Sequence, residues 1–329
     1  MSPALYRRIT LVTLASLVFI MVTGAAVRLT GSGLGCSTWP SCEPDSFTPR
    51  SASDGHGMIE FVNRLITAAV MLFTLAAVIG AHRRRPRRAD LFRWSLGLPA
   101  WVMANAIVGL LVVVLDLSPV SVIGHFLLSL GALWNAVVLH EKAGEPDPVV
   151  APADAADADA DGGMPPAVAA PTAARRELAV PAVRRACDLL LVAAGLALVL
   201  GTIVTGSGPH AGDQAADRLD FVVGDIARLH GIAVMLFLGL TLAVLWMVRR
   251  GDAAPAVEQR LRVLLVVLVA QAAVGYTQYF TGVPAVLVGV HVLGAALVWI
   301  AVLRVRLGLT EPVAVPLDRP VEARPVLTA

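Results

Sequence analysis

The sequence predicts an all-α integral membrane protein whose eight transmembrane helices form two pseudo-symmetric four-helix bundles. Three observations lead to this fold class: the composition, eight long apolar runs, and an internal repeat. Of the 329 residues, 57% are hydrophobic and only 15% are charged, and the mean hydropathy is +0.75. A soluble domain normally carries about a quarter charged residues. The apolar runs are each near the roughly 20 residues that cross a bilayer.

Each apolar run is expected to form one membrane-spanning helix. The first run is expected to stay in the membrane, because it is too long for a cleavable signal peptide and no small-residue cleavage site precedes the next motif. The expected spans are residues 9–29, 58–80, 94–115, 119–139, 187–205, 226–248, 261–280 and 284–303.

Basic residues are distributed unevenly between the two sides of the expected membrane protein. With the N-terminus in the cytoplasm, only five of the 26 Lys and Arg residues fall on the outer side. By the positive-inside rule, this asymmetry predicts cytoplasmic N- and C-termini. Because the basic residues flank spans and form no soluble basic domain, no nucleic acid partner is expected. The outer residues are Arg28, Arg50, Arg64, Arg218 and Arg228.

Two segments differ from the rest of the chain in composition. Residues 141–183 are rich in Ala, Pro and Asp without apolar periodicity, which is typical of a disordered linker. Residues 307–329 contain scattered prolines and are expected to form a disordered tail. Both segments are expected on the cytoplasmic side. They leave an N-terminal four-helix half, residues 1–140, and a C-terminal four-helix half, residues 184–306.

The two halves resemble each other in sequence. Three polar residues of the first half have polar counterparts in the second half at nearly equal offsets, which are hard to obtain by chance. Because each half has four spans, the predicted repeats keep the same orientation and are parallel. The matching pairs are Asn63 with His230, Asn105 with Gln271, and His125 with His291.

Three of the seven histidines lie within apolar sequence. His125, His230 and His291 each lie about 7–10 Å inside an expected helix at 1.5 Å per residue, so they share one depth on the outer side. In the second bundle, His230 and His291 could ligate a haem iron from opposite sides. The alternative is that each is a core histidine hydrogen-bonded to a neighbouring helix. Solvated positions are expected for His82, His140 and His210.

The first half departs from this symmetry at Asn63, which is not a strong haem ligand. Glu60 precedes Asn63 by one turn, and His56 precedes Glu60 by another, so His56 and Glu60 share one helix face. Arg64 also lies one turn from Glu60. Glu60 could therefore form an interface salt bridge, or it could be an acid–base group beside a bound molecule. A half with one firm ligand, His125, leaves an iron position open and suits a substrate site.

The cysteines agree with the expected topology. Cys36 and Cys42 share the first outer loop, where oxidising conditions permit a disulfide. The pair could staple the loop, or it could exchange electrons with a partner as a redox-active dithiol. Cys187 lies alone at the cytoplasmic start of the fifth span, where a thiol is expected to stay reduced.

A set of short motifs extends over all eight spans and omits only the linker and the tail. The motifs are Val27-Arg28-Leu29-Thr30-Gly31-Ser32-Gly33-Leu34-Gly35-Cys36 with Trp39-Pro40 and Cys42; Ile59-Glu60 with Asn63-Arg64; Gly124-His125-Phe126; Val204-Thr205-Gly206-Ser207-Gly208-Pro209-His210-Ala211-Gly212; Arg228-Leu229-His230; and Gln271, Gly275, Gln278-Tyr279, Gly282, Pro284 and His291. Each motif alone is weak, but together they resemble the bacterial haem A synthase family.

The resemblance implies a haem-dependent oxidation of the C8 methyl group of haem O to a formyl group. The product, haem A, serves terminal oxidases of the cytochrome c oxidase type. Water would supply the oxygen atom, and electrons would pass to an acceptor by way of the second haem. By position, His230 and His291 would ligate a resident haem b, and His125 would ligate the substrate haem. Glu60 would be needed for turnover.

The resemblance also implies partners and further site residues. Many members have a histidine in place of Asn63, so His56 becomes a candidate substitute in binding the substrate haem. Cys36 and Cys42 match the family's loop pair and are expected to form its disulfide. The implied partners are the lipid bilayer of a bacterial cell, haem O, a haem O synthase, an electron acceptor and further copies in a homo-oligomer. Residues that could contact haem propionates, or extend to water, are Arg28, Arg64 and Arg228.

Two other classes of protein would use the same residues. A quinol-linked dihaem b-type electron carrier would keep two haems permanently, but Asn63 and Glu60 argue against it. A transporter with parallel repeats would use the buried histidines as proton relays, but their matched depths argue against it.

Overall fold

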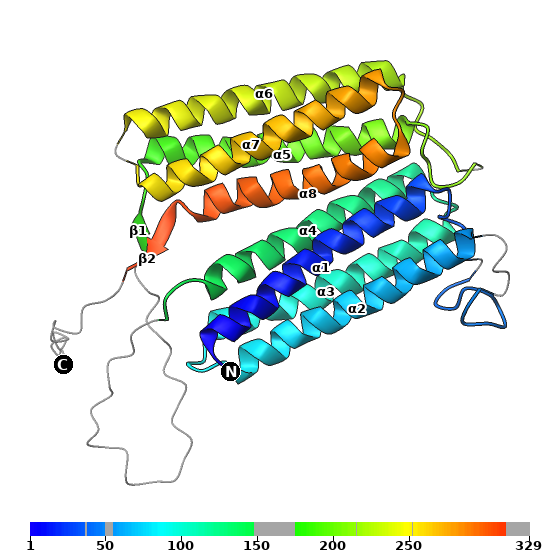
Figure 1. Cartoon of the computed structure of the whole chain (residues 1–329), viewed down its shortest axis with the longest axis horizontal. Helices are drawn as coiled ribbons and strands as arrows, with labels where there is room; N and C mark the ends of the chain where they lie inside the picture. The colour runs from blue at the N-terminus through cyan, green and yellow to red at the C-terminus, as the bar shows by residue number, and fades with distance from the viewer. Residues whose placement is uncertain (37, 50–54, 148–174, 215, 252, 314–329) are drawn as a thin grey trace, which may run out of the picture.

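The computed structural model describes residues 1–36, 38–49, 55–147, 175–214, 216–251 and 253–313 (Figure 1). Within these residues, eight helices are long and apolar enough to span a membrane, which confirms the predicted fold class. They are α1 (Pro3–Leu29), α2 (His56–Arg83), α3 (Ala89–Val114), α4 (Pro119–Ala143), α5 (Pro181–Ser207), α6 (Val223–Arg250), α7 (Pro255–Phe280) and α8 (Ala285–Leu307). Most of them extend beyond the predicted apolar runs because the polar flanking residues are also helical.

Proline begins several of these helices. Pro3, Pro119, Pro181 and Pro255 are the first residues of α1, α4, α5 and α7. Proline suits this position because its backbone angle is already helical, and the N–H that it lacks would have no acceptor in the first turn. These prolines therefore mark the residues at which α1, α4, α5 and α7 begin.

The helices form two four-helix bundles, α1–α4 and α5–α8, which lie side by side (Figure 1). Contacts between the bundles come from α1 and α4 on one side and from α5 and α8 on the other. Trp299 of α8 packs against the apolar cores of both bundles. Its indole N–H donates to the carbonyl oxygen of Leu130 in α4 at 3.0 Å. In lipid, such close packing and interhelical hydrogen bonds hold helices together.

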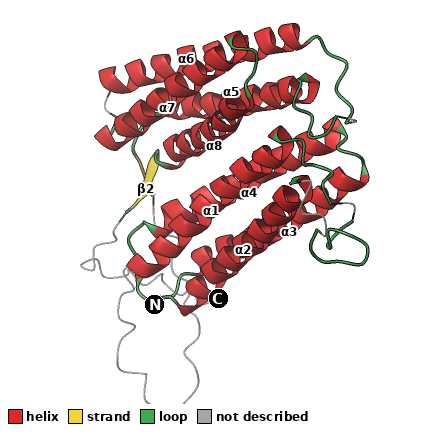
Figure 2. Ribbon diagram, turned by 45° about the vertical axis from the view of Figure 1, so that its right-hand side comes forward, coloured by secondary structure: helices red, strands yellow, loops and turns green. Residues whose placement is uncertain are grey.

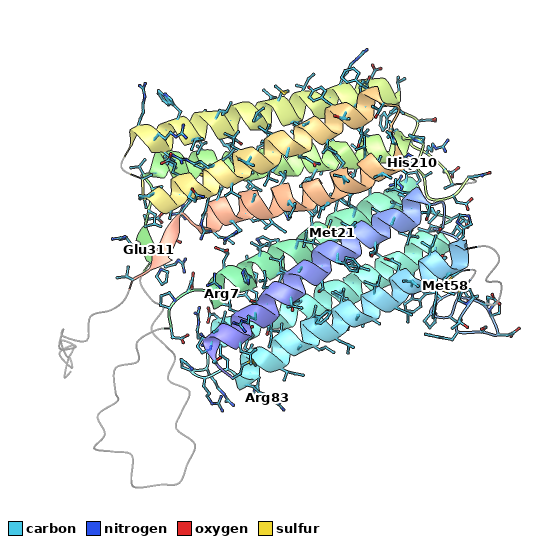
Figure 3. All side chains as sticks on the ribbon, in the orientation of Figure 1. Arg7, Met21, Met58, Arg83, His210 and Glu311 are labelled. Atoms are coloured by element: carbon cyan, nitrogen blue, oxygen red, sulfur yellow. A yellow bond between two sulfur atoms is a disulfide. The ribbon has the colours of Figure 1, made fainter. Side chains whose placement is uncertain are left out.

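The two ends of the molecule differ in the residues they carry. Figure 3 shows Arg7 and Arg83 at one end and His210 and Met58 at the other, which we call the His210 end. At the opposite end, Glu141 of α4 forms ion pairs at 2.8 Å with Arg260 of α7 and Arg304 of α8. These ion pairs join the two bundles outside the apolar region.

A short strand pair connects segments that are predicted to be disordered. β1 (Arg175–Glu177) pairs antiparallel with β2 (Thr310–Pro312), which follows α8 (Figure 2). In addition, α4 continues to Ala143 and α5 begins at Pro181. The ends of the predicted linker, and the start of the predicted tail, are therefore structured. Residues 148–174 and 314–329 lie outside the described residues, and the boundaries of the two halves stay a prediction.

Candidate functional site

Two histidine rings face each other in the second bundle near the His210 end. His230 lies on α6 and His291 on α8, and their ring centres are 6.4 Å apart with an angle of 77° between the ring planes. When two imidazoles bind the same metal ion from opposite sides, each at about 2 Å, their ring centres are roughly 6 Å apart. The structure thus brings together the two residues that the sequence predicts as a ligand pair.

Each of these two histidines has a ring nitrogen that is free to bind a metal. Nδ1 of His230 lies 3.0 Å from the carbonyl oxygen of Ala197, which only accepts, so Nδ1 carries the proton. Such a bond fixes the ring and leaves Nε2 as the metal-binding atom. Nδ1 of His291 is buried without a hydrogen-bond partner. Among the described residues, no group of three His, Cys, Asp or Glu side chains could hold a bare metal ion. A pair of imidazoles fits haem, which brings its own in-plane ligands.

Glycines on the neighbouring helices make room for both rings. A Cβ atom added to Gly275 of α7 would lie 3.0 Å from Cε1 of His291. A Cβ atom added to Gly201 of α5 would lie 3.2 Å from Cε1 of His230. These contacts are shorter than ordinary packing distances between carbon atoms. The ring positions therefore depend on the absence of a side chain at these two sites.

The first bundle repeats half of this arrangement. His125 of α4 packs against Gly109 of α3, where an added Cβ atom would lie 3.4 Å from Cε1 of the ring. As in His291, Nδ1 of His125 is buried without a hydrogen-bond partner. His125 and Gly109 thus correspond to His291 and Gly275 of the second bundle. A haem iron could be bound from this side by His125.

The position opposite His125 differs from its counterpart. Asn63 of α2 takes the place of His230, and its side-chain oxygen accepts a hydrogen bond from the Thr23 hydroxyl of α1 at 2.8 Å. His56 is the exposed first residue of α2, and its Nδ1 lies 2.9 Å from the Ser32 hydroxyl. At 1.5 Å per residue, it lies about 10 Å along the helix from Asn63. This placement does not favour His56 as a substitute ligand, and haem binding by His56 or Asn63 stays a prediction.

Glu60 is buried, with 6% of its surface exposed, beneath the first loop of the His210 end. One carboxylate oxygen accepts from the backbone N–H of Cys36 at 2.8 Å, and the other forms an ion pair with Arg64. Arg64 also donates to the carbonyl oxygens of Thr38 and Ser41, at 2.7 and 3.0 Å. Glu60 therefore forms the salt bridge with Arg64 that the sequence allowed, and both of its carboxylate oxygens have partners. Its acid–base role stays a prediction.

The loop above Glu60 contains the predicted disulfide between Cys36 and Cys42. Both cysteines are buried and pack against Phe61 of α2. The structure confirms the bond, whereas its redox activity stays a prediction. Cys187 is a free, buried cysteine in α5.

Two further outer arginines, Arg28 and Arg228, have partners within the protein. Arg28 donates to the carbonyl oxygens of His210 and Thr205, at 2.6 and 2.9 Å, and so links α1 to the second half. Arg228 is exposed and pairs with Asp225 at 3.3 Å. Contacts of Arg28, Arg64 and Arg228 with haem propionates stay a prediction. Arg50 lies outside the described residues.

Sequence reasoning assigned no role to Thr23 or to the glycines that face the histidine rings. Gly275 stands in one of the motifs, and Gly109 and Gly275 are separated by the same offset as His125 and His291, so the repeat already pairs them. The roles of Thr23 and Gly201 depend on which residue of a neighbouring helix they touch, which the sequence pattern does not give.

Comparisons with known proteins show which proteins the chain is similar to. The family model described as "Cytochrome oxidase assembly protein" (COX15-CtaA) matches residues 7–303. A "Heme A synthase" of Geobacillus kaustophilus (strain HTA426) is 30% identical over 107 residues, and one of Geobacillus thermodenitrificans is 28% identical over 107 residues. Each alignment covers 32% of this chain and 32% of the relative. The chain thus spans about a third of the length of the curated relatives it matches.

Proposed function

The chain belongs to the cytochrome oxidase assembly protein family, and we propose that it is a haem A synthase. In this proposal it oxidises the C8 methyl group of haem O to a formyl group and releases haem A. The two similar proteins are named heme A synthases. The main support from the structure is the difference between the bundles: two imidazoles face each other in the second, whereas one stands alone in the first.

The reaction requires an oxygen donor and an electron acceptor. Converting a methyl group to a formyl group with water as the oxygen source releases four protons and four electrons for each haem O. Glu60 is the ionisable side chain placed one turn from Asn63 in the first bundle, and we assign it the removal of protons from the substrate. The Cys36 N–H and the Arg64 guanidinium hold its carboxylate in place.

His230 and His291 would hold a resident haem b in the second bundle. When bound, this haem would supply one-electron transfer. The Ala197 carbonyl oxygen keeps the proton of His230 on Nδ1, and Gly201 and Gly275 set where the rings stand. His125 would bind the iron of haem O. An electron acceptor would take up the electrons, and a haem O synthase would deliver the substrate.

The proposed location is a bacterial cell membrane with both termini in the cytoplasm. The eight apolar helices support a multi-pass membrane protein. The basic residues of the Arg7 end favour that end as the cytoplasmic one. The disulfide loop and the histidines His125, His230 and His291 would then lie toward the oxidising outer side, where the disulfide is stable.

The test is to co-express the chain with a haem O synthase and to separate the extracted haems chromatographically. We expect haem A from the wild type and none from His125→Ala or Glu60→Ala. His140→Ala, at the opposite end of α4, is the matched control and should still give haem A. If the extract contained only haem b and unreacted haem O, the chain would be an electron carrier and not a synthase.

A further inference from the structure

The first two helices of each bundle make one contact that differs between the halves. In the second bundle, Gly201 of α5 faces His230 of α6. In the first bundle, Thr23 of α1 faces Asn63 of α2. A small residue thus stands opposite the large imidazole, and a larger residue stands opposite the smaller amide. In each bundle, the residue on the first helix is small where its partner on the second helix is large, or the reverse.

The space beside His230 exists because Gly201 has no side chain. An added Cβ atom would lie 3.2 Å from Cε1 and 3.5 Å from Nδ1 of the ring. Threonine would add two further heavy atoms on that Cβ, and its χ1 angle has few allowed values in a helix. The ring could not keep its hydrogen bond to the Ala197 carbonyl oxygen beside such a side chain.

Thr23 has a second effect in the first bundle, because its hydroxyl forms a hydrogen bond with the one atom of Asn63 that could bind a metal. An amide can bind a metal only through its oxygen, since the lone pair of the amide nitrogen is delocalised. That oxygen accepts the hydrogen bond from the Thr23 hydroxyl at 2.8 Å. An imidazole at position 63, oriented as His230 is, would need at Thr23 the room that Gly201 leaves in the second bundle. Thr23 also holds the oxygen atom of Asn63 through this hydrogen bond.

We propose that Thr23 is a specificity-determining residue that keeps the face opposite His125 free of a protein ligand to iron. Haem in the first bundle is then held by His125 alone and can be exchanged. Haem in the second bundle is held from both sides and stays bound. This inference deepens the proposed function and rests on it for the identity of the ligand, haem O.

The test adds a histidine with and without the space that it needs. Full-length wild type, N63H, T23G and T23G/N63H are purified with the second-bundle haem in place and titrated with haem O. We expect T23G/N63H to show additional low-spin absorption of bis-histidine haem. It should also retain haem O about tenfold more tightly than N63H, the scale on which residues around a metal ligand alter affinity. N63H and T23G should each resemble the wild type.

Two controls accompany the double variant. S16G/N63H places the new glycine on α1 away from Asn63, and it should behave as N63H alone. T23G/N63H/H125A should lose the additional low-spin signal, because that signal requires both imidazoles. The second-bundle haem spectrum in each sample reports whether the protein is folded. Equal retention of haem O by N63H and T23G/N63H would overturn the proposal. Retention of haem O by T23G/N63H at the wild-type level, with an intact second-bundle haem spectrum, would also overturn it.

The second bundle allows the reverse experiment. Gly201→Thr should remove most of the bis-histidine haem of the second bundle. Gly195→Thr, on the same helix, should not, because an added Cβ atom at Gly195 has no neighbour within 4 Å. A full complement of low-spin haem in Gly201→Thr would contradict the inference. These experiments measure haem binding, so a protein that binds haem as expected but forms no haem A would contradict the proposed function alone.

Discussion

The two bundles share a histidine on their last helix and differ in what stands opposite it. In the second bundle the opposite residue is His230, and Gly201 leaves room for its ring. In the first bundle it is Asn63, hydrogen-bonded to Thr23. The first bundle also has a buried carboxylate, Glu60, whereas the second has Ala227 at the corresponding position. In the proposed function, this duplicated scaffold holds one haem permanently and processes another. The repeat matches two of these differences, Asn63 with His230 and Glu60 with Ala227.

The largest expected effect is the difference between replacing His291 of α8 and replacing His125 of α4. His291→Ala should abolish the low-spin haem that stays with the purified protein, because one of the two histidines that would hold this haem is lost. His125→Ala should retain that haem and lose haem A formation. The haem content per chain and the reduced-minus-oxidised spectrum measure the first effect. A full complement of low-spin haem in His291→Ala would show that the second bundle is not the resident site.

The next effect concerns the carboxylate that only the first bundle has. Glu60→Gln should lower the rate of haem A formation by about a hundredfold or more, because general acid–base groups contribute on that scale. Glutamine keeps an oxygen for the Cys36 N–H, so the loop should stay in place. A thiol assay that finds Cys36 and Cys42 still oxidised provides this control. Full conversion in Glu60→Gln would exclude the acid–base role.

A smaller effect sharpens the comparison between the glycines behind the rings. Gly275→Ala should weaken haem binding in the second bundle by about tenfold or more, since displaced metal ligands lose affinity on that scale. Gly109→Ala should weaken haem O binding less, because its Cβ atom would lie 3.4 Å from the ring and not 3.0 Å. Gly239→Ala, with no neighbour within 4 Å of the added atom, is the control for both. Equal losses in all three variants would indicate a general effect on helix packing.

The smallest effect tests how each bundle anchors its last helix. Gln271 donates to the carbonyl oxygen of His291 at 2.8 Å. In the first bundle the shorter Asn105 does not make this bond directly, and Ser129 lies within hydrogen-bonding distance of both Asn105 and the His125 carbonyl oxygen. Gln271→Met should therefore weaken the binding of haem in the second bundle by about 1 kcal/mol, which is the net value of one hydrogen bond.

That loss would appear as a fewfold faster dissociation of the second-bundle haem. Ser129→Ala should speed the dissociation of haem O from the first bundle to a similar extent. If Gln271→Met removed the haem as completely as His291→Ala, the hydrogen bond would have a role beyond positioning.

The sequence predicted the features that depend on local periodicity and on the repeat. The eight helices follow from the apolar runs, and the facing of His230 and His291 follows from their duplicated depths. The contact between Thr23 and Asn63 was not predicted, because it depends on how α1 and α2 are rotated against each other. The pairing of Arg175–Glu177 with Thr310–Pro312 was missed for a similar reason. It joins segments distant in sequence whose composition gives no strand signal.

The most direct measurement follows isotopically labelled haem O through the purified protein. Washed protein is loaded with labelled haem O, given an electron acceptor, and then chased with unlabelled haem O. We expect the label to leave as haem A, while one unlabelled haem b per chain stays bound through His230 and His291. Two permanently bound haems, with the label recovered only as haem O, would contradict the distinction between a resident site and a substrate site.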